Sequence, residues 1–300
     1  TREDGKEEVF SACIKPDDTR YLGGNKSSSV VATKLQGRPR TGISYDKANE
    51  FCTNRGDWIT MIDYLEYCAL QALCYIEYAN FDNQATLNTN LTSDGFKQGG
   101  LGDGVTNLNW EKWTAFNGNN PIVQTYWTAE HNIGNGSTNG DHYELGNYNA
   151  DGSNLNTYPA VYRGILNFFG DIWTFIRDVV IINRNANYNS VYLLKKGVNY
   201  SDITIDNIQD KCYFIGDQTN SNSFITEFDF RFGPYFIPNK VGTNKKADYN
   251  WIRGSNGQDT DKAVRVLLLG GNAANGSAAG SSDFNSSWVR PVSSANIGFF

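Results

Sequence analysis

The C-terminal stretch Ala263–Phe300 constrains the fold more than any other part of the chain. Val264–Leu269 is a short run of β-branched and leucine residues closed by Gly270-Gly271, which is typical of a buried strand. Ile297–Phe300 predicts a second short strand. The Asn272–Ser287 run between them is rich in Asn, Gly, Ala and Ser and has almost nothing to bury. Such long loops in compact domains are usually functional or disordered, so we expect a solvent-facing loop held between two strands.

The residues of this stretch carry a resemblance. Arg265–Asn272, followed later by Asn296-Ile-Gly-Phe, resembles the C-terminal signature of C-type-lectin-fold proteins. More narrowly, it resembles the branch that contains formylglycine-generating enzymes and the variable proteins of diversity-generating retroelements. Gly271–Gly280 is closest to the variable proteins, in which mutagenic reverse transcription randomises adenine-containing codons. The chain departs from the family at Gly298-Phe-Phe300, where Gly-Phe-Arg is more typical.

Two earlier stretches support the same resemblance. The helix–Gly–helix order around Arg55–Thr60 is similar to that of the family, without the proline of its turn. Tyr162–Trp173 resembles the family's Asn-x-x-Gly-Asn-Val-Trp-Glu-Trp motif, with Asp171 in place of the usual Asn and Thr174 in place of the usual Glu. In that family the motif closes the core beside the last strands, which implies that Ile172–Ile182 is a strand.

Two helices are predicted in the first third of the chain. Ser44 precedes a helical pattern that ends at Gly56 and has one apolar face, made by Tyr45, Ala48, Phe51 and Cys52. Thr60–Asp63 is a capping-box-like start for a second helix. Its apolar residues at helical spacing are Met61, Leu65, Cys68, Ala69, Ala72 and Ile76.

Short strands account for most of the other apolar runs. These are Val9–Ile14, Val30–Ala32, Val191–Leu194, Cys212–Ile215 and Phe224–Phe230. Many short strands with two early helices predict an α+β protein. Together with the resemblance, this predicts a single C-type lectin-like domain over residues 1–300, with short, mostly antiparallel strands and long loops.

Bulk composition limits the partners and the compartment. The net charge of −6 argues against nucleic acid or an anionic membrane as partner. No apolar run has the length of a membrane span, and the charged start Thr1–Glu8 is unlike a signal peptide. The five cysteines are odd in number and scattered, which favours reduced thiols. We therefore expect synthesis in a reducing cytoplasm and, from the resemblance, display on a virion tail or a cell surface.

Few residue patterns indicate catalysis or metal binding. A formylglycine-generating oxidase needs a cysteine pair late in the chain to hold copper, and the last cysteine is Cys212. The lectin calcium signatures Glu-Pro-Asn, Gln-Pro-Asp and Trp-Asn-Asp are absent, and Asn147–Tyr158 has Tyr where an EF-hand needs a bidentate Glu. We expect no catalytic residues, no metal ligands and no cofactor. The many Asp and Asn residues of the loops are still compatible with a structural Ca²⁺ or Mg²⁺ ion.

The histidines leave two interpretations open. His131 and His142 lie near Glu130, Asp141 and Glu144, which is compatible with a metal or acid–base cluster. They are equally the polar residues of an Asn/Gly-rich loop, and we favour this second interpretation.

The resemblance implies a ligand-binding face in the segment of about residues 249–298. Ala274, Ala278, Asp283, Ser286, Ser287, Ser293 and Ser294 resemble diversified positions. The full predicted face comprises Tyr249, Trp251, Arg253, Asn256, Ala274, Ala278, Ser281, Ser282, Asp283, Asn285, Ser286, Ser287, Trp288, Arg290, Ser293 and Ser294. Trp251 and Trp288 fit a core role as well as they fit this face.

The expected function is ligand display by a variable protein, as a viral tail receptor-binding protein or a cell-surface adhesin. The expected partner is a protein or glycan on a host cell, met through multivalent display and without membrane insertion. An atypical formylglycine-generating-type enzyme and a purely structural tail protein remain the alternatives.

Overall fold

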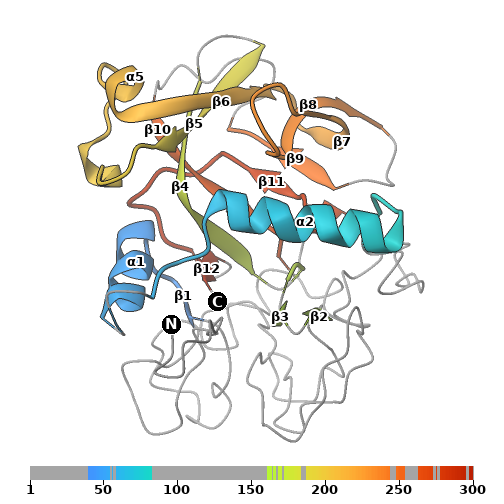
Figure 1. The fold of residues 1–300 in the computed structure, drawn as a ribbon, viewed down its shortest axis with the longest axis horizontal. Helices are drawn as coiled ribbons and strands as arrows, with labels where there is room; N and C mark the ends of the chain where they lie inside the picture. The colour runs from blue at the N-terminus through green and yellow to red at the C-terminus, as the bar shows by residue number, and fades with distance from the viewer. Residues whose placement is uncertain are drawn as a thin grey trace, which may run out of the picture.

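The computed structural model describes residues 40–54, 56, 59–82, 161–163, 165–166, 168–170, 172–183, 187–243, 248–253, 263–272, 275, 278–294 and 297–299. These residues form short strands and few helices (Figure 1), the α+β composition predicted from the sequence. The elements are β1 (Arg40–Thr41), α1 (Tyr45–Thr53), α2 (Tyr64–Tyr78), β2 (Val161–Tyr162), β3 (Ile165–Leu166), β4 (Trp173–Asn183), β5 (Tyr188–Leu194), the 3-10 turn η3 (Tyr200–Asp202), α5 (Ile208–Lys211), β6 (Cys212–Thr219), β7 (Ser223–Asp229), β8 (Ile237–Gly242), β9 (Tyr249–Trp251), β10 (Val264–Leu269), β11 (Phe284–Asn285) and β12 (Ile297–Phe299).

Strand β4 holds both ends of the C-terminal stretch. Within the described residues ten strands form one sheet, in the order β1-β12-β4-β10-β11-β9-β7-β8, with β5 between β4 and β6. β10 pairs antiparallel with β4, and β12 pairs parallel with the start of β4. Thr174 of β4 therefore has Leu269 on one side and Gly298 on the other. The two predicted C-terminal strands are confirmed, and they flank the same central strand.

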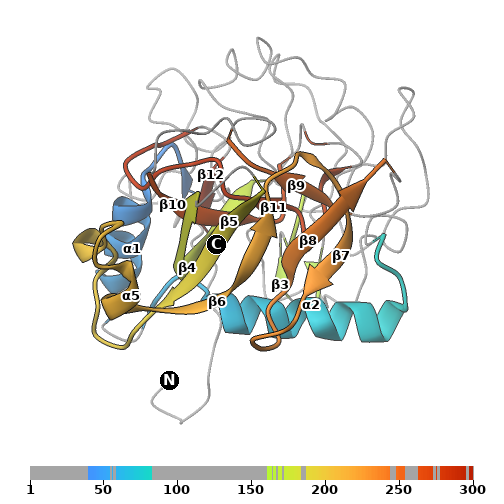
Figure 2. The same cartoon turned by 90° about the horizontal axis from the view of Figure 1, so that it is seen from above.

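The central strands are buried on both faces, which explains their continuous apolar sequence. Leu267 and Leu269 of β10 belong to a cluster that includes Tyr64, Tyr67 and Cys68 of α2. Val266 and Leu268, on the opposite face, belong to a cluster that includes Tyr45, Ala48 and Cys52 of α1. Figure 2 shows α1 and α2 lying on different sides of these strands.

A local irregularity in β4 ties the sheet to the start of α2. Asp178 has a positive φ of 67°, which interrupts the alternation of the strand. Arg177 turns outward, and its guanidinium lies 3.5 Å from the Asp63 carboxylate. The Arg177 N–H donates to the carbonyl of Ile62 at 2.9 Å. Arg177 thus connects β4 to the two residues that precede α2, Ile62 and Asp63.

Helix α1 confirms the first predicted helix. The Ser44 hydroxyl accepts a hydrogen bond from the Lys47 N–H, as expected of an N-cap, and Asp46 lies in the first turn. Tyr45, Ala48 and Cys52 are buried, so the predicted apolar face is the inward face.

Helix α2 is confirmed as an element, but its predicted start is wrong, and within the helix its predicted face matches the buried face only at Cys68. The N-cap is Asp63, which forms a capping box with Glu66, so the helix begins after Asp63 rather than at Thr60. Leu65 is exposed and Ile76 is 78% exposed. The inward face instead carries Tyr64, Tyr67, Cys68, Gln71 and Cys74. The inward positions include hydrogen-bonding side chains, which apolar periodicity alone does not count.

Most other predicted strands are present. Val191–Leu194, Cys212–Ile215 and Phe224–Phe230 correspond to β5, β6 and β7, and Ile172–Ile182 corresponds to β4. Strands β1, β2, β3, β8, β9 and β11 were not predicted from the sequence. The predicted strands Val9–Ile14 and Val30–Ala32 lie outside the described residues.

Among the described cysteines, Cys52, Cys68, Cys74 and Cys212 are buried thiols that form no disulfide, in agreement with the prediction of reduced thiols. Cys13 lies outside the described residues.

Candidate functional site

Residues 270–296, the part of the predicted binding segment between β10 and β12, are here called the C-terminal segment, which leaves β10 through a glycine turn. Gly270 and Gly271 have φ values of 92° and 71°, in the left-handed region that favours glycine. A side chain at Gly271 has no room, because its Cβ would lie 2.9 Å from the Cα of Ala279. The turn therefore directs the segment back against the interior, where Gly270 N–H donates to the carbonyl of Asp283 at 3.2 Å.

Helix α2 binds the middle of the segment. The Gln71 amide donates from Nε2 to the Ser281 carbonyl at 2.8 Å and to the Ser282 hydroxyl at 2.9 Å. The Tyr75 hydroxyl is also hydrogen-bonded to the Ser282 hydroxyl. The polar inward positions of α2 thus satisfy polar groups of a loop that would otherwise be buried without partners.

Two carboxyl groups lie beneath the same part of the segment. The Trp251 indole donates to Asp283 Oδ1 at 2.8 Å, and the Ser282 N–H donates to Asp248 Oδ2. Burial raises the pKa of the Asp283 carboxyl well above its ordinary range, the nearby Asp248 carboxylate raises it further, and the Trp251 hydrogen bond lowers it. Asp283 is therefore part of the interior.

The expectation that the run from Asn272 to Ser287 faces solvent is wrong for residues 278–286, which are buried. Asp283 is 0% exposed, and the predicted face residues Ala278, Ser281, Ser282, Asn285 and Ser286 are also buried. The reason is the small size of these residues, which lets the backbone approach α2 and β10 closely. A run with little apolar surface can still be buried when its polar groups find partners.

Strand β9 lies beside this buried half. β11 pairs parallel with β9, with Asn285 opposite Trp251, and the Ser286 N–H donates to the Trp251 carbonyl at 3.0 Å. The rings of Tyr249 and Trp251 lie 4.3 Å apart at an interplanar angle of 38°. The structure thus brings Tyr249 and Trp251 next to residues 284–286, from which they are distant in sequence. Arg253, two residues after Trp251, is exposed.

The second half of the segment, residues 287–294, lies nearer the surface. Trp288 is partly buried against the cluster that contains α1. Arg290 Nε lies 3.5 Å from Asp46 Oδ2 of α1, and both side chains are partly exposed. The Gly42 N–H donates to the Ser294 carbonyl at 2.9 Å, while Ser293 is exposed.

The sixteen predicted face residues therefore separate into groups. Tyr249, Trp251, Arg253, Ser287, Trp288, Arg290, Ser293 and Ser294 are exposed or partly exposed, and six others are buried. Asn256 and Ala274 lie outside the described residues.

Three of the described thiols, Cys68, Cys74 and Cys212, have raised pKa values. Burial raises the pKa of Cys68 and of Cys74 to about 12, and that of Cys212 to about 11. At neutral pH these groups are protonated, whereas the thiolate is the reactive and metal-binding form.

Among the residues that the structure describes, no group of three or more His, Cys, Asp or Glu side chains is arranged to hold a metal ion. His131, His142 and the Asn147–Tyr158 loop lie outside the described residues.

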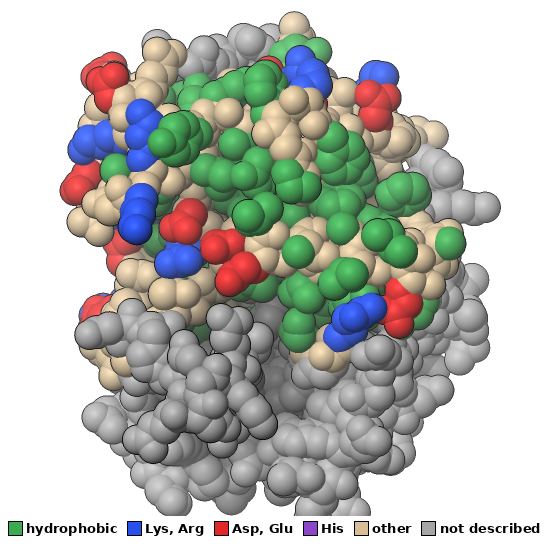
Figure 3. Space-filling view, in the orientation of Figure 1, with side chains coloured by type: hydrophobic (Ala, Val, Ile, Leu, Met, Phe, Trp, Pro, Cys, Tyr) green, Lys and Arg blue, Asp and Glu red, His purple; other side chains and the backbone are tan. Residues whose placement is uncertain are grey.

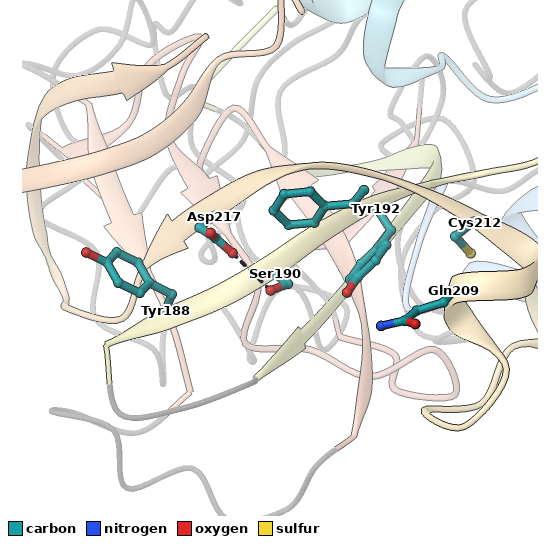
Figure 4. A pocket seen from close by; sticks show the side chains of 7 residues that line it. Tyr188, Ser190, Tyr192, Gln209, Cys212 and Asp217 are labelled. Carbon is teal, nitrogen blue, oxygen red and sulfur yellow. Dashed lines mark hydrogen bonds between the residues drawn. The ribbon is translucent and has the colours of Figure 1, made fainter. Parts of the chain in front are cut away.

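A separate pocket of about 440 Å³ opens on the β5–β6 hairpin beside α5 (Figure 4). The Ser190 hydroxyl donates to Asp217 Oδ1 at 2.9 Å within it. Tyr188 lies at one end, and Gln209 and Cys212 lie at the other. The pocket contains none of the predicted face residues, and no pattern in the sequence indicated it.

Comparison with protein-family models and with curated proteins yields no match for this chain. None of the helices in the described part of the chain is long and apolar enough to cross a membrane.

Proposed function

We propose that the protein displays a ligand-binding face on a C-type lectin-like fold, as a variable protein of a diversity-generating retroelement. The observation that carries this proposal is the way the C-terminal segment is held. Its ends lie on the two sides of β4, and its middle is hydrogen-bonded to Gln71 of α2. A fixed backbone that leads into surface side chains is the arrangement that recognition loops need.

The recognition face that we propose is narrower than the whole segment. It consists of the exposed and partly exposed residues Tyr249, Trp251, Arg253, Ser287, Trp288, Arg290, Ser293 and Ser294. Substitutions at exposed positions without packing roles change stability by within about 0.5 kcal/mol, so several of them can vary together. The buried residues, Asp283 among them, hold the backbone shape instead.

The ligand we propose is a protein or glycan on a host cell. Trp and Arg are the residues that most often dominate binding energy, and the face offers Trp251, Trp288, Arg253 and Arg290. The serines add little contact area, so one site alone binds weakly. Several linked copies gain about 10²–10⁴ in avidity, which favours display on a virion tail or a cell surface.

The first test is genetic. The proposal expects a reverse transcriptase gene near the coding sequence, with a near-copy of its 3′ end that differs at adenines. Its absence from a complete genome would remove the retroelement from the proposal.

The second test is binding to intact host cells by monomeric and natively assembled protein. We expect strong attachment only for the assembled form, and weaker attachment for Arg290→Ala. Tight binding by the monomer that Arg290→Ala leaves unchanged would place the site elsewhere.

A further inference from the structure

A pocket of about 550 Å³ lies between the C-terminal end of α2 and strand β7. Its walls include Tyr75, Phe81, Phe228 and Phe230, with Glu227 and Asp248 among the polar lining residues. Figure 3 shows hydrophobic side chains gathered over the face that α2 forms with the strands above it. None of the pocket residues belongs to the recognition face proposed above, so the inference below stands independently of that function.

Aromatic rings follow one another around this pocket. The Tyr75 and Phe81 ring centroids lie 4.8 Å apart, those of Phe81 and Phe228 lie 6.4 Å apart, and those of Phe228 and Phe230 lie 6.2 Å apart. Phe81 and Phe230 remain 58% and 51% exposed. Rings left this open to solvent at the edge of a pocket are available to a ligand.

The charged side chains that line the pocket are both acidic, Glu227 and Asp248. Asp248 is buried, while Glu227 is exposed and lies 2.6 Å from the Lys240 ammonium. Ala79 and Asn80 place the C-terminal end of α2 at the wall, and the last turn of α2 carries no basic residue. A helix C-terminus holds partial negative charge. Among the described residues that line the pocket, none is Lys, Arg or His.

We propose that this pocket binds an organic cation of the quaternary ammonium class, such as a choline group. Aromatic faces attract a cation through their quadrupole, and the Asp248 carboxylate and the helix terminus add attraction of the same sign, whereas Glu227 is already paired with Lys240. A primary ammonium is strongly hydrated and requires several hydrogen-bond acceptors. A methylated ammonium is weakly hydrated and packs directly on rings, which suits a pocket lined by Tyr75, Phe81, Phe228 and Phe230.

The occupant would lie close to the anchor of the C-terminal segment. Asp248 Oδ2 accepts the Ser282 N–H, and the Tyr75 hydroxyl bonds to the Ser282 side chain. Two residues of the pocket wall therefore also hold the segment.

The test is isothermal titration of the full chain with tetramethylammonium chloride and with choline, against sodium chloride at equal ionic strength. The matched neutral probe is 3,3-dimethylbutan-1-ol, which has the shape of choline without its charge. We expect saturable binding of both cations and binding of the alcohol at least about tenfold weaker. Equal binding of the alcohol, or no saturable binding of either cation, would overturn the proposal.

Variants assign the binding to this pocket. Phe81→Leu and Phe230→Leu should each weaken cation binding by about 3- to 30-fold. Phe232→Leu is the matched control, because Phe232 is 52% exposed and does not line the pocket. If Phe232→Leu weakens binding as much as the pocket variants do, the assignment fails. Phosphocholine and Nε-trimethyllysine are the final arms, and the tighter of them identifies the source as a headgroup or a protein.

Discussion

The two halves of the C-terminal segment both contain serines but lie in opposite environments. Residues 278–286 are buried, whereas residues 287–294 are partly or fully exposed. Serine occurs in both: Ser281 and Ser282 contact α2 beneath the surface, and Ser293 faces solvent. The difference comes from neighbours, since the first half passes under Gln71 and Tyr75 while the second passes over the edge of the α1 cluster.

We infer from this contrast that the two halves have different structural roles. The buried half determines where the backbone runs, so its residues are limited in size and polarity by what surrounds them. We expect the exposed side chains of the second half to be exchangeable without moving the backbone, apart from Trp288, which packs against the α1 cluster. Substitutions that destabilise the protein by different amounts test whether the buried and the exposed half differ in this way.

Gly271→Ala should destabilise the protein by about 2–4 kcal/mol. Its Cβ would overlap Asp283 Oδ2 and lie 2.9 Å from the Cα of Ala279, an overpacking that typically costs 1–3 kcal/mol. Alanine at a φ of 71° adds about 1 kcal/mol of backbone strain. Chemical denaturation measures the change.

Gly197→Ala is the matched control. Gly197 has a φ of 82°, but nothing lies within 4 Å of its Cβ position, so this variant isolates the backbone strain. Equal losses for Gly271→Ala and Gly197→Ala would show that the first half of the segment is not tightly packed.

Asp283 should make stability fall with rising pH. Its pKa is raised in the folded protein by burial first and then by Asp248, so the unfolded chain releases this proton at a lower pH than the folded chain does. Between those two pKa values the unfolded state binds fewer protons, and stability declines by up to about 1.4 kcal/mol per pH unit. Within the described part of the chain, Asp283 Oδ2 has no hydrogen-bond partner that would offset this effect.

Denaturation of the wild type and of Asp283→Asn across pH 4–8 checks this effect. Asparagine keeps an oxygen to accept the Trp251 N–H and cannot ionise, so the decline assigned to residue 283 should disappear. A decline that persists unchanged in Asp283→Asn would assign the linkage to other groups.

How far the sequence predicts this structure differs between its helices. The Ser44 cap and the apolar spacing of α1 agree with each other, and the helix follows them. In α2 the same method selected Leu65 and Ile76, which are exposed, and omitted Gln71, which is buried. Buried Gln71 donates a hydrogen bond to the carbonyl of Ser281. Because Ser281 is far from Gln71 in sequence, no local pattern around the helix predicts this contact.

The candidate site was predictable in its ends and not in its middle. The strands at Val264–Leu269 and Ile297–Phe299 follow from local apolar runs. The parallel pairing of Trp251 with Asn285 joins short strands far apart in sequence, and no local pattern specifies such a contact. Burial of the serine-rich run was missed for a related reason, because its polar groups are satisfied by partners distant in the chain.

Arg290→Ala should cost less than about 1 kcal/mol. The Arg290–Asp46 pair spans 3.5 Å between partly exposed side chains, and exposed ion pairs contribute about 0–1 kcal/mol. Raising the salt concentration should remove most of the difference between the variant and the wild type. A double-mutant cycle with Asp46→Asn measures the pair directly, and a coupling well above 1 kcal/mol would place Arg290 in the structural half of the segment.

The smallest effect is expected at Ser293. Its side chain is exposed, and neighbouring contacts of the chain here run through backbone atoms, such as the Ser294 carbonyl that accepts the Gly42 N–H. Ser293→Tyr should therefore change the free energy of unfolding by within about 0.5 kcal/mol.

Ser286→Tyr is the comparison that gives the Ser293 result its meaning. Ser286 is buried beside Trp251, so the same substitution must displace packed atoms, a change that costs about 1–3 kcal/mol. The same Ser→Tyr exchange at Ser286 and at Ser293 then measures how tightly each half of the segment is packed. If both variants have the same melting temperature as the wild type, residues 278–286 do not hold the backbone. If both melt early, residues 287–294 are not free to vary, and the proposed recognition face loses its physical basis.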